Sequence, residues 1–258
     1  MIVRYRALRR VVLVCGLVAA FAADAAEVEA QLDWVRRVEL GTLVSGVVTE
    51  LNVAPGAEVL TGQVLLRLDQ RAMRARLDEA QARAKAAELV FAEAKREMER
   101  AQELYDRTVL SDHELMEAKI AFGKADVAKH SDDALLAQAQ MDVQYSEIRA
   151  PFAAVVIKLN AQLGQVVANQ FQSVPLVVIA ESGRMAAQAE VDAQTAARWV
   201  IGSPARVRVG AIEYVGEVRA VGFEPVGRQN GGPRYYATVV FDTKKQILRA
   251  GQTARIEW

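Results

Sequence analysis

The sequence has few of the residues that reactive sites need. It contains one cysteine, Cys15, and two histidines, His113 and His130, in 258 residues. A single cysteine excludes an internal disulfide framework and a cysteine-based zinc site. Two histidines are too few for most metal centres and catalytic triads. We therefore predict a protein that is not an enzyme, with no catalytic residues, no metal site and no cofactor.

The chain also lacks an excess of charge and is poor in aromatic residues. Its 32 Lys and Arg residues balance 32 Asp and Glu residues, and aromatics make up only 6%. Nucleic-acid binding proteins normally carry a basic excess, and those that bind single strands add aromatic stacking platforms. We therefore predict no nucleic-acid partner. A hydrophobic content of 52% over this length is typical of a folded chain with one or several domains.

The N-terminal residues have the pattern of an export signal. A basic stretch without acids (Arg4, Arg6, Arg9 and Arg10) precedes the apolar run 11–23 and small residues that fit a cleavage site. The run is shorter than the roughly 20 residues that span a bilayer as a helix. We therefore predict a signal peptide over residues 1–25 and a periplasmic protein; a retained N-terminal anchor is the alternative.

The chain contains an internal repeat whose two copies are separated by a long segment. The pattern V-V-x-x-L-N-x-x-x-G-x-x-V occurs at residues 47–59 and again 108 residues later, at 155–167. Each copy is followed by a second apolar run, 64–68 and 176–179. Short valine-rich runs separated by glycine and proline are typical of strands and turns. Neither copy is long enough for a core of its own, so we predict that both form halves of one pseudo-symmetric β-sandwich.

The segment between the two copies is typical of a helix. Residues 70–142 contain no proline, one glycine and seventeen alanines. Apolar residues repeat every seven positions, with a smaller residue three positions later, as in a coiled-coil seam. The first half of the seam comprises Leu77, Ala80, Ala84, Ala87, Phe91, Ala94, Met98, Ala101 and Tyr105. The second half comprises Leu115, Ala118, Phe122, Ala125, Leu136, Ala139 and Val143, interrupted by Lys129 and Asp132.

The seam breaks at residues 108–112, where we predict a turn. Thr108 and Val109 are poor helix formers, and Ser111 with Glu114 has the spacing of a capping box at the start of the next helix. Two arms of about 35 residues each, or roughly 50 Å, then form an antiparallel hairpin. Arg100 and Leu104 share a face outside the seam near this turn. We therefore expect Leu104 to be an exposed apolar residue that contacts a partner.

The final segment, 181–258, returns to strand patterns. We predict strands at 205–209, 235–241 and 254–258, a hairpin-like pattern within 212–221, a glycine-rich loop at 227–233 and a short helix at 193–200. Several short antiparallel strands in so few residues indicate a small β-barrel. The predicted fold is thus α+β and elongated: a β-sandwich split by a long helical hairpin and followed by a β-barrel.

This order of segments resembles the periplasmic adaptor, or membrane fusion (HlyD-like), family of efflux and secretion systems. The first half-motif matches at residues 45–48, 55–56, 62–65 and 68–69. The second matches at 148–152 and 164–167, and the barrel ends in a similar way at 248–252. The resemblance implies a lipoyl-like sandwich, or barrel-sandwich hybrid. It divides the chain into 26–69 (N-terminal segment and first half), 70–144 (hairpin), 145–180 (second half) and 181–258 (barrel).

The hairpin carries a further match to this family. Adaptors of TolC-type outer-membrane channels have the pattern R-x3-L-x6-S at the hairpin tip, and Arg100, Leu104 and Ser111 fit this spacing. The resemblance implies that these residues bind the channel. It also implies that several copies form a homo-oligomeric ring, and that the sandwich and barrel face an inner-membrane transporter of the RND or ABC type.

Two alternatives remain beside an adaptor of an RND pump. The half-motifs also resemble lipoyl or biotinyl carrier modules, although Leu68-Asp69-Gln70 offers no lysine where a carrier is modified. An adaptor of an ABC-type exporter is the second alternative, because we expect the membrane-proximal domain common in RND adaptors to be missing or rudimentary. A metal-efflux adaptor has less support, since the six methionines are dispersed.

Overall fold

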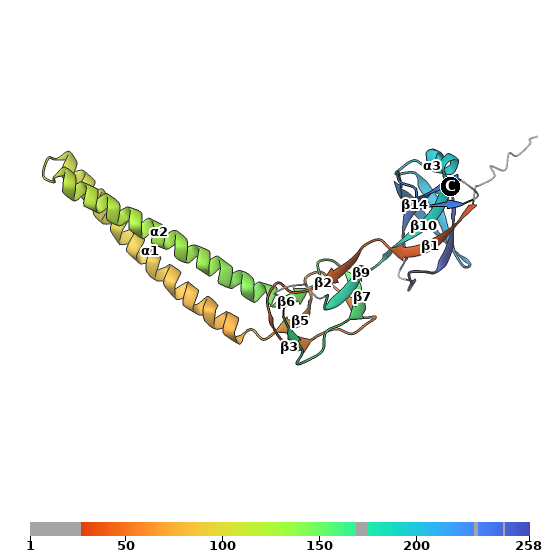
Figure 1. Ribbon diagram of the computed structural model, residues 1–258, viewed down its shortest axis with the longest axis horizontal. Helices are drawn as coiled ribbons and strands as arrows, with labels where there is room; N and C mark the ends of the chain where they lie inside the picture. Colours follow the sequence, from red (N-terminus) through yellow and green to blue (C-terminus); the bar gives the residue numbers. More distant parts are fainter. Residues whose placement is uncertain (1–26, 169–174, 230–231, 245) are drawn as a thin grey trace, which may run out of the picture.

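A computed structural model describes residues 27–168, 175–229, 232–244 and 246–258. The molecule is elongated: a helical hairpin projects from one end of a β-sandwich, and a β-barrel lies at the other end (Figure 1). This confirms the predicted α+β fold. The predicted signal peptide, with Cys15, lies outside the described residues.

The sandwich consists of two four-stranded antiparallel sheets. Its strands are β2 (Arg37–Leu40), β3 (Gly46–Leu51), β4 (Glu58–Val59), β5 (Val64–Leu68), β6 (Glu147–Arg149), β7 (Ala154–Leu159), β8 (Val166–Val167) and β9 (Val177–Glu181). One sheet has the order β2-β9-β7-β4 and the other the order β6-β5-β3-β8. Each sheet therefore combines strands from before and after the hairpin, so neither half can complete a sheet alone.

The two halves of the sandwich are related by the repeat seen in the sequence. The Gly56 amide donates to the Val156 carbonyl at 2.8 Å, and the Gly164 amide donates to the Val48 carbonyl at 2.9 Å. In each case the equivalent residues are 108 positions apart. Both glycines have positive φ angles, +86° and +80°, which residues with a Cβ adopt only at a cost. These reciprocal bonds confirm the predicted pseudo-symmetric sandwich.

Leucine and isoleucine side chains form the core of the sandwich. Leu65, Leu66 and Leu68 from the first half pack with Leu176 and Ile179 from the second, all fully buried. The strands that carry them are nearly continuous apolar runs, as expected for strands covered on the core side and flanked by turns. The core therefore joins segments more than 100 residues apart in the chain.

The hairpin consists of α1 (Arg71–Asp106) and α2 (Asp112–Tyr145). The buried seam residues are Ala80, Ala84, Ala87 and Ala101 on α1 and Leu115, Ala125 and Ala139 on α2. Apart from Leu115, the larger apolar seam residues are half-buried; among them, the rings of Phe91 and Phe122 lie 5.4 Å apart. The predicted seam is confirmed. Alanine in alternate layers lets the helices approach closely, and most of the large seam side chains keep part of their surface exposed.

Polar contacts fix the base of the hairpin to the sandwich. The Gln70 amide donates to the Ser146 hydroxyl at 2.7 Å, and the Arg67 guanidinium lies 2.9 Å from the Glu147 carboxylate. Burial alone would raise the pKa of Glu147, but hydrogen bonds from Arg149, Arg67 and Gln70 outweigh it and lower that pKa. This network holds the hairpin in one direction relative to the sheets.

The barrel is formed by β1 (Glu27–Trp34), β10 (Arg184–Asp192), β11 (Pro204–Val209), β12 (Ile212–Val221), β13 (Gly227–Gln229), β14 (Gly232–Asp242) and β15 (Thr253–Glu257). Six strands follow one another in the order β10-β1-β15-β11-β12-β14, and the barrel closes because β14 also pairs with β10. The short strand β13 pairs with the start of β14. The short helix α3 (Ala193–Arg198) confirms the helix predicted after residue 193. Closure removes the free sheet edges that otherwise promote aggregation.

The structure corrects three expectations about the barrel. Residues 27–34 form a barrel strand between β10 and β15, although the sequence division grouped them with the sandwich half. Residues 212–221 form one strand and not a hairpin. Within the expected loop 227–233, the described residues belong to strands β13 and β14. These differences share a cause: pairing with distant strands decided the conformation, and local spacing could not show the partners.

The helices in the described part of the chain contain too few apolar residues to cross a membrane. In the described part of the chain, none has a window that is both long enough and apolar enough for a transmembrane span.

Candidate partner-binding site at the hairpin tip

The turn at the tip is held by its own backbone. The amide of Thr108 donates to the carbonyl of Tyr105 at 2.8 Å, and the amide of Val109 donates to the carbonyl of Leu104 at 3.0 Å. This is a Schellman ending of α1, which requires a left-handed residue and usually has glycine there. Thr108 occupies that position with φ of 63°. A β-branched residue in this conformation stores strain, a feature that clusters at functional sites.

Ser111 starts α2 through the predicted capping box. Its hydroxyl accepts from the Glu114 amide at 3.3 Å and donates to the Glu114 carboxylate at 2.6 Å; its own amide donates to that carboxylate at 2.9 Å. These bonds lower the pKa of Glu114, with the bond from the Ser111 side chain as the largest cause. The hydroxyl is therefore occupied within the chain, and the first role of Ser111 is to fix the turn.

Arg100 is an exposed cation near the tip. It lies on α1 about one turn before Leu104, and its guanidinium forms an ion pair with Glu97 three residues earlier, at 2.9 Å. An exposed ion pair of this kind contributes little stability. Arg100 is thus free to exchange this partner for an acceptor on another protein, and its planar head can form two parallel hydrogen bonds.

Leu104 is half-buried, which corrects the expectation that it is exposed. Its position borders the seam, and the loop after α1 folds back so that Val109 bonds to its carbonyl. The exposed apolar side chain at this turn is Val109, which the sequence reasoning did not single out. Leu104 therefore offers part of its surface, with Val109 beside it in the turn.

The two histidines lie 17 residues apart on α2, each beside one carboxylate. His113 lies 3.4 Å from Glu117, and His130 lies 3.4 Å from Asp126, each one turn away on the exposed surface of α2. Among the described residues, no group of three or more His, Cys, Asp or Glu side chains is arranged to hold a metal ion. The tip is a thin pair of helices (Figure 1).

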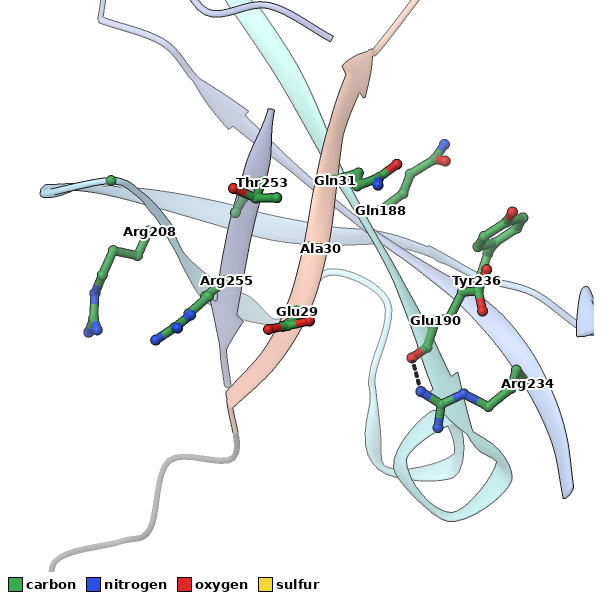
Figure 2. A pocket seen from close by; sticks show the side chains of 12 residues that line it. Glu29, Ala30, Gln31, Gln188, Glu190, Arg208, Arg234, Tyr236, Thr253 and Arg255 are labelled. Carbon is green, nitrogen blue, oxygen red and sulfur yellow. Dashed lines mark hydrogen bonds between the residues drawn. The ribbon is translucent and has the colours of Figure 1, made fainter. Parts of the chain in front are cut away.

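A concave surface, separate from the hairpin tip, lies on the outside of the barrel. It is lined by polar residues of β1, β10, β14 and β15, among them Glu29, Gln31 and Arg255 (Figure 2). The Arg234 guanidinium donates to the Glu190 carbonyl at 2.7 Å across one side of it. In β1, Glu29 and Gln31 alternate with the buried Ala30 and Leu32, a strand signal that could have revealed this segment in the sequence. The surface carries charges of both signs.

A family match agrees with this architecture. The family described as "CzcB-like, barrel-sandwich hybrid domain" matches residues 36–181, which include the whole sandwich and the hairpin. The protein belongs to this family. All seven barrel strands, β1 and β10–β15, lie outside the matched residues.

Relatives of this CzcB-like chain are export and membrane fusion proteins. The multidrug resistance protein MdtA of Pectobacterium carotovorum is 29% identical over 45% of the chain and 28% of MdtA. The macrolide export protein MacA of Escherichia coli O157:H7 is 26% identical over 88% of the chain and 65% of MacA. The chain thus spans less than two thirds of the length of these curated relatives. The membrane fusion protein Spr0693 of Streptococcus pneumoniae has the same fold, with a TM-score of 0.68, 16% identity, and coverage of 90% of this chain and 98% of Spr0693.

These likenesses confirm the resemblance to periplasmic adaptor proteins that the sequence motifs indicated. They place this CzcB-like protein among the adaptor proteins of export systems.

Proposed function

We propose that the protein is the periplasmic adaptor of a tripartite efflux pump and joins an inner-membrane transporter of the RND or ABC type to a TolC-type outer-membrane channel. The observation that carries this proposal is a rod of two paired helices that leaves a folded sandwich and ends far from it (Figure 1). With 36 residues in α1, the rod extends about 54 Å. A rod of that length adds no core to the sandwich, and its tip is positioned to contact another protein.

Three residues are proposed to bind the channel: Arg100, Leu104 and Ser111. Arg100 supplies several hydrogen-bond donors, Leu104 supplies a small apolar contact next to Val109, and Ser111 holds the turn in shape through its cap. Because a two-helix tip is narrow, the contact of one copy is small. Several copies acting together would multiply a weak contact.

The proposed location is the periplasm. The chain would be exported by its N-terminal segment, associate with the inner membrane through the transporter, and form a homo-oligomeric ring whose hairpins point toward the channel. The sandwich and barrel would contact the transporter. The division of the chain at residues 69, 144 and 180 is proposed to separate these contacts, with the strand 27–34 contributing to the barrel.

The tip is tested by charge reversal in cells that depend on the protein for export. Arg100→Asp and Leu104→Asp are expected to abolish export and to remove cross-links between the tip and the channel. Since Leu104 is half-buried, Leu104→Ala is included, and circular dichroism must show that each variant keeps its helix content.

Arg83→Asp is the matched control for Arg100→Asp. Arg83 is likewise exposed on α1 and likewise ion-paired, at 2.7 Å from Glu79, but it lies near the base of the hairpin. The Arg83→Asp variant is expected to leave export and the cross-links to the channel unchanged. Normal export and cross-linking in folded Arg100→Asp and Leu104→Asp would show that the tip assignment is wrong.

A further inference from the structure

Strands β1 and β10 part at one end of the barrel. Their pairing ends at Ala30 and Ala189. Beyond that point β1 stays beside β15 as far as its first residue, Glu27, and β10 stays beside β14 as far as its last residue, Asp192. The hydrogen-bonded wall of the barrel is therefore open between β1 and β10 at this end.

The concave surface on the outside of the barrel lies at this opening. It has a volume of about 780 Å³, which is within the range of small-molecule sites. The guanidinium of Arg234 donates to the carbonyl of Glu190 at 2.7 Å, an acceptor that would bond to β1 if the sheet were unbroken. A side chain thus takes the place of the missing strand contact and keeps the pocket open.

The carboxylates of Glu29 and Glu190 line this pocket without a cation. They would face each other if the pairing of β1 and β10 continued, and they lie on the two sides of the opening (Figure 2). The two arginines beyond Glu29, on β15 and β11, are paired with other acids: Arg255 with Glu27, and Arg208 with Glu257. Within the described part of the chain, neither pocket carboxylate has an ion pair or a hydrogen bond. Because neighbouring like charges repel, the pocket favours a positively charged group.

Uncharged polar side chains complete the pocket. Gln31 and Gln188 face each other at its closed end, and Thr253 lies beside Gln31 on β15 (Figure 2). Tyr236 is 43% exposed and lies opposite Glu190 on β14. Among the described residues, these four side chains have no hydrogen-bond partner. Amides and hydroxyls pair with the hydroxyls of a sugar, and an aromatic ring packs against the apolar face of a sugar ring.

We propose that this pocket binds an amino sugar with a free ammonium group. The ammonium lies between Glu29 and Glu190, and hydroxyls of the sugar bond to Gln31 and Gln188. The apolar face of the sugar packs on Tyr236, whose ring also attracts the cation. A lone metal ion would leave most of the pocket empty, and a plain alkylammonium would leave the amides unpaired. The site uses neither the hairpin tip nor a transporter, so it does not depend on the proposed adaptor role.

Three soluble probes test the site on the purified protein by isothermal titration calorimetry in slightly acidic buffer. The glucosamine tetramer should bind about tenfold more tightly than the N-acetylglucosamine tetramer, which has the same rings without the charge. Spermidine has charge without rings and should bind more weakly than the glucosamine tetramer. Equal binding of the two tetramers, no binding of the glucosamine tetramer, or spermidine binding as tightly as that tetramer would overturn the proposal.

Glu29→Gln and Glu190→Gln remove the charge of the pocket and keep its shape. Each is expected to lower the affinity for the glucosamine tetramer about tenfold and to leave that for the N-acetylglucosamine tetramer unchanged. Glu217→Gln is the matched control. Glu217 is likewise exposed and likewise unpaired among the described residues, but it lies on β12 outside the pocket. An equal loss of affinity in Glu217→Gln would show general attraction to an acidic surface and would refute the site.

Tyr236→Ala tests the packing of the sugar ring. It is expected to weaken the binding of both tetramers, because both have the apolar face that the tyrosine contacts. Tyr236→Phe keeps the ring and should bind both nearly as tightly as the unaltered protein. Thermal denaturation must show that each variant keeps its fold. Unchanged binding by Tyr236→Ala would contradict the proposed packing.

The pocket and the adaptor role fail separately, because sugar binding is measured on the isolated protein and export is measured in cells. Absence of glucosamine binding, with export still lost in Arg100→Asp, would reject the pocket alone. Glucosamine binding that depends on Glu190, with normal export in Arg100→Asp, would reject the tip site alone.

Discussion

The sandwich and the hairpin bury apolar side chains in different ways. In the sandwich, Leu66 and Ile179 come from opposite halves of the chain and are fully buried between two sheets. In the hairpin, only alanines and one leucine of the seam are buried, and Phe91 stays half-exposed. Two sheets enclose a volume, whereas two helices share only a line of contact. The sandwich is therefore built for stability, and the hairpin leaves most of its surface available to other proteins.

A core substitution in the sandwich should have the largest effect. Leu66→Ala is expected to lower the free energy of unfolding by about 2–5 kcal/mol, because it opens a cavity where no solvent reaches. Thermal denaturation followed by the β-sheet signal measures the loss. A loss below that of the Phe91 substitution described next would contradict the contrast between enclosed and linear packing.

The corresponding substitution in the hairpin should cost less. Phe91→Ala removes a half-buried ring that contacts Phe122 at 5.4 Å. We expect a loss of roughly 2 kcal/mol, below the ~3–5 kcal/mol of a fully buried phenylalanine. Hydrogen exchange should quicken in both helices near residues 91 and 122 and stay unchanged in the sandwich strands. Unchanged exchange in the helices would show that the seam register is wrong.

Two glycines in equivalent sandwich turns offer a finer comparison with the hairpin glycine. Gly164→Ala forces a Cβ into a left-handed residue with φ of +80° and should cost about 1–2 kcal/mol. Gly56→Ala should cost a similar amount, since the pseudo-symmetry repeats the same turn. Gly123→Ala, in a helix, should instead stabilise the monomer by up to about 1 kcal/mol. Urea denaturation measures the change in the free energy of unfolding for each substitution. A change in the same direction at all three positions would contradict this prediction.

Relief of strain at the tip should give a small gain. Thr108→Gly replaces a β-branched residue at φ of 63° by the residue that this turn favours. We expect a gain of about 1 kcal/mol, confined to the ends of the two helices. Slower hydrogen exchange at residues 104–112 measures it. Thr108→Ser is the control, because it keeps a Cβ and a hydroxyl and should bring no comparable gain.

Acid should loosen the same turn by the smallest amount. Hydrogen bonds from Ser111 lower the folded pKa of Glu114 below its usual 4.5, so the cap contributes fully above that value. The contribution is lost as the pH falls through the lower folded pKa. Helix content by circular dichroism between pH 6 and pH 3 should therefore fall more in the unaltered protein than in Glu114→Gln. Identical pH profiles of the two proteins would show that the Glu114 carboxylate does not contribute to the cap.

Much of the fold was predictable because its signals are local or repeat. The seam from Leu77 to Val143 follows from seven-residue spacing, and the cap at Ser111 follows from the position of Glu114. The sandwich follows from one motif that occurs twice. Residues 27–34 carry an alternating strand pattern, but their place in the barrel was not predictable, because their partners β10 and β15 lie more than 150 residues away in the chain.

The candidate site was predictable only in part. The spacing predicted Arg100, Leu104 and Ser111 as site residues, but it did not predict what surrounds them in the structure. The fold of the turn decides that Leu104 is half-buried, that Ser111 uses its hydroxyl within the chain, and that Val109 is the exposed apolar residue. Burial depends on what lies opposite a side chain, and a turn can bring a loop across a helix end without any periodic signal.

The order of residues by itself determined a repeated sandwich motif, two long helices between its halves and strands after them, because periodicity and turn residues act over a few positions. Only the tertiary structure decided which strands pair, how the barrel closes, and that Phe91 meets Phe122 across the hairpin. Those outcomes depend on the register between distant segments. That register is set when their side chains pack together and is not written in either segment alone.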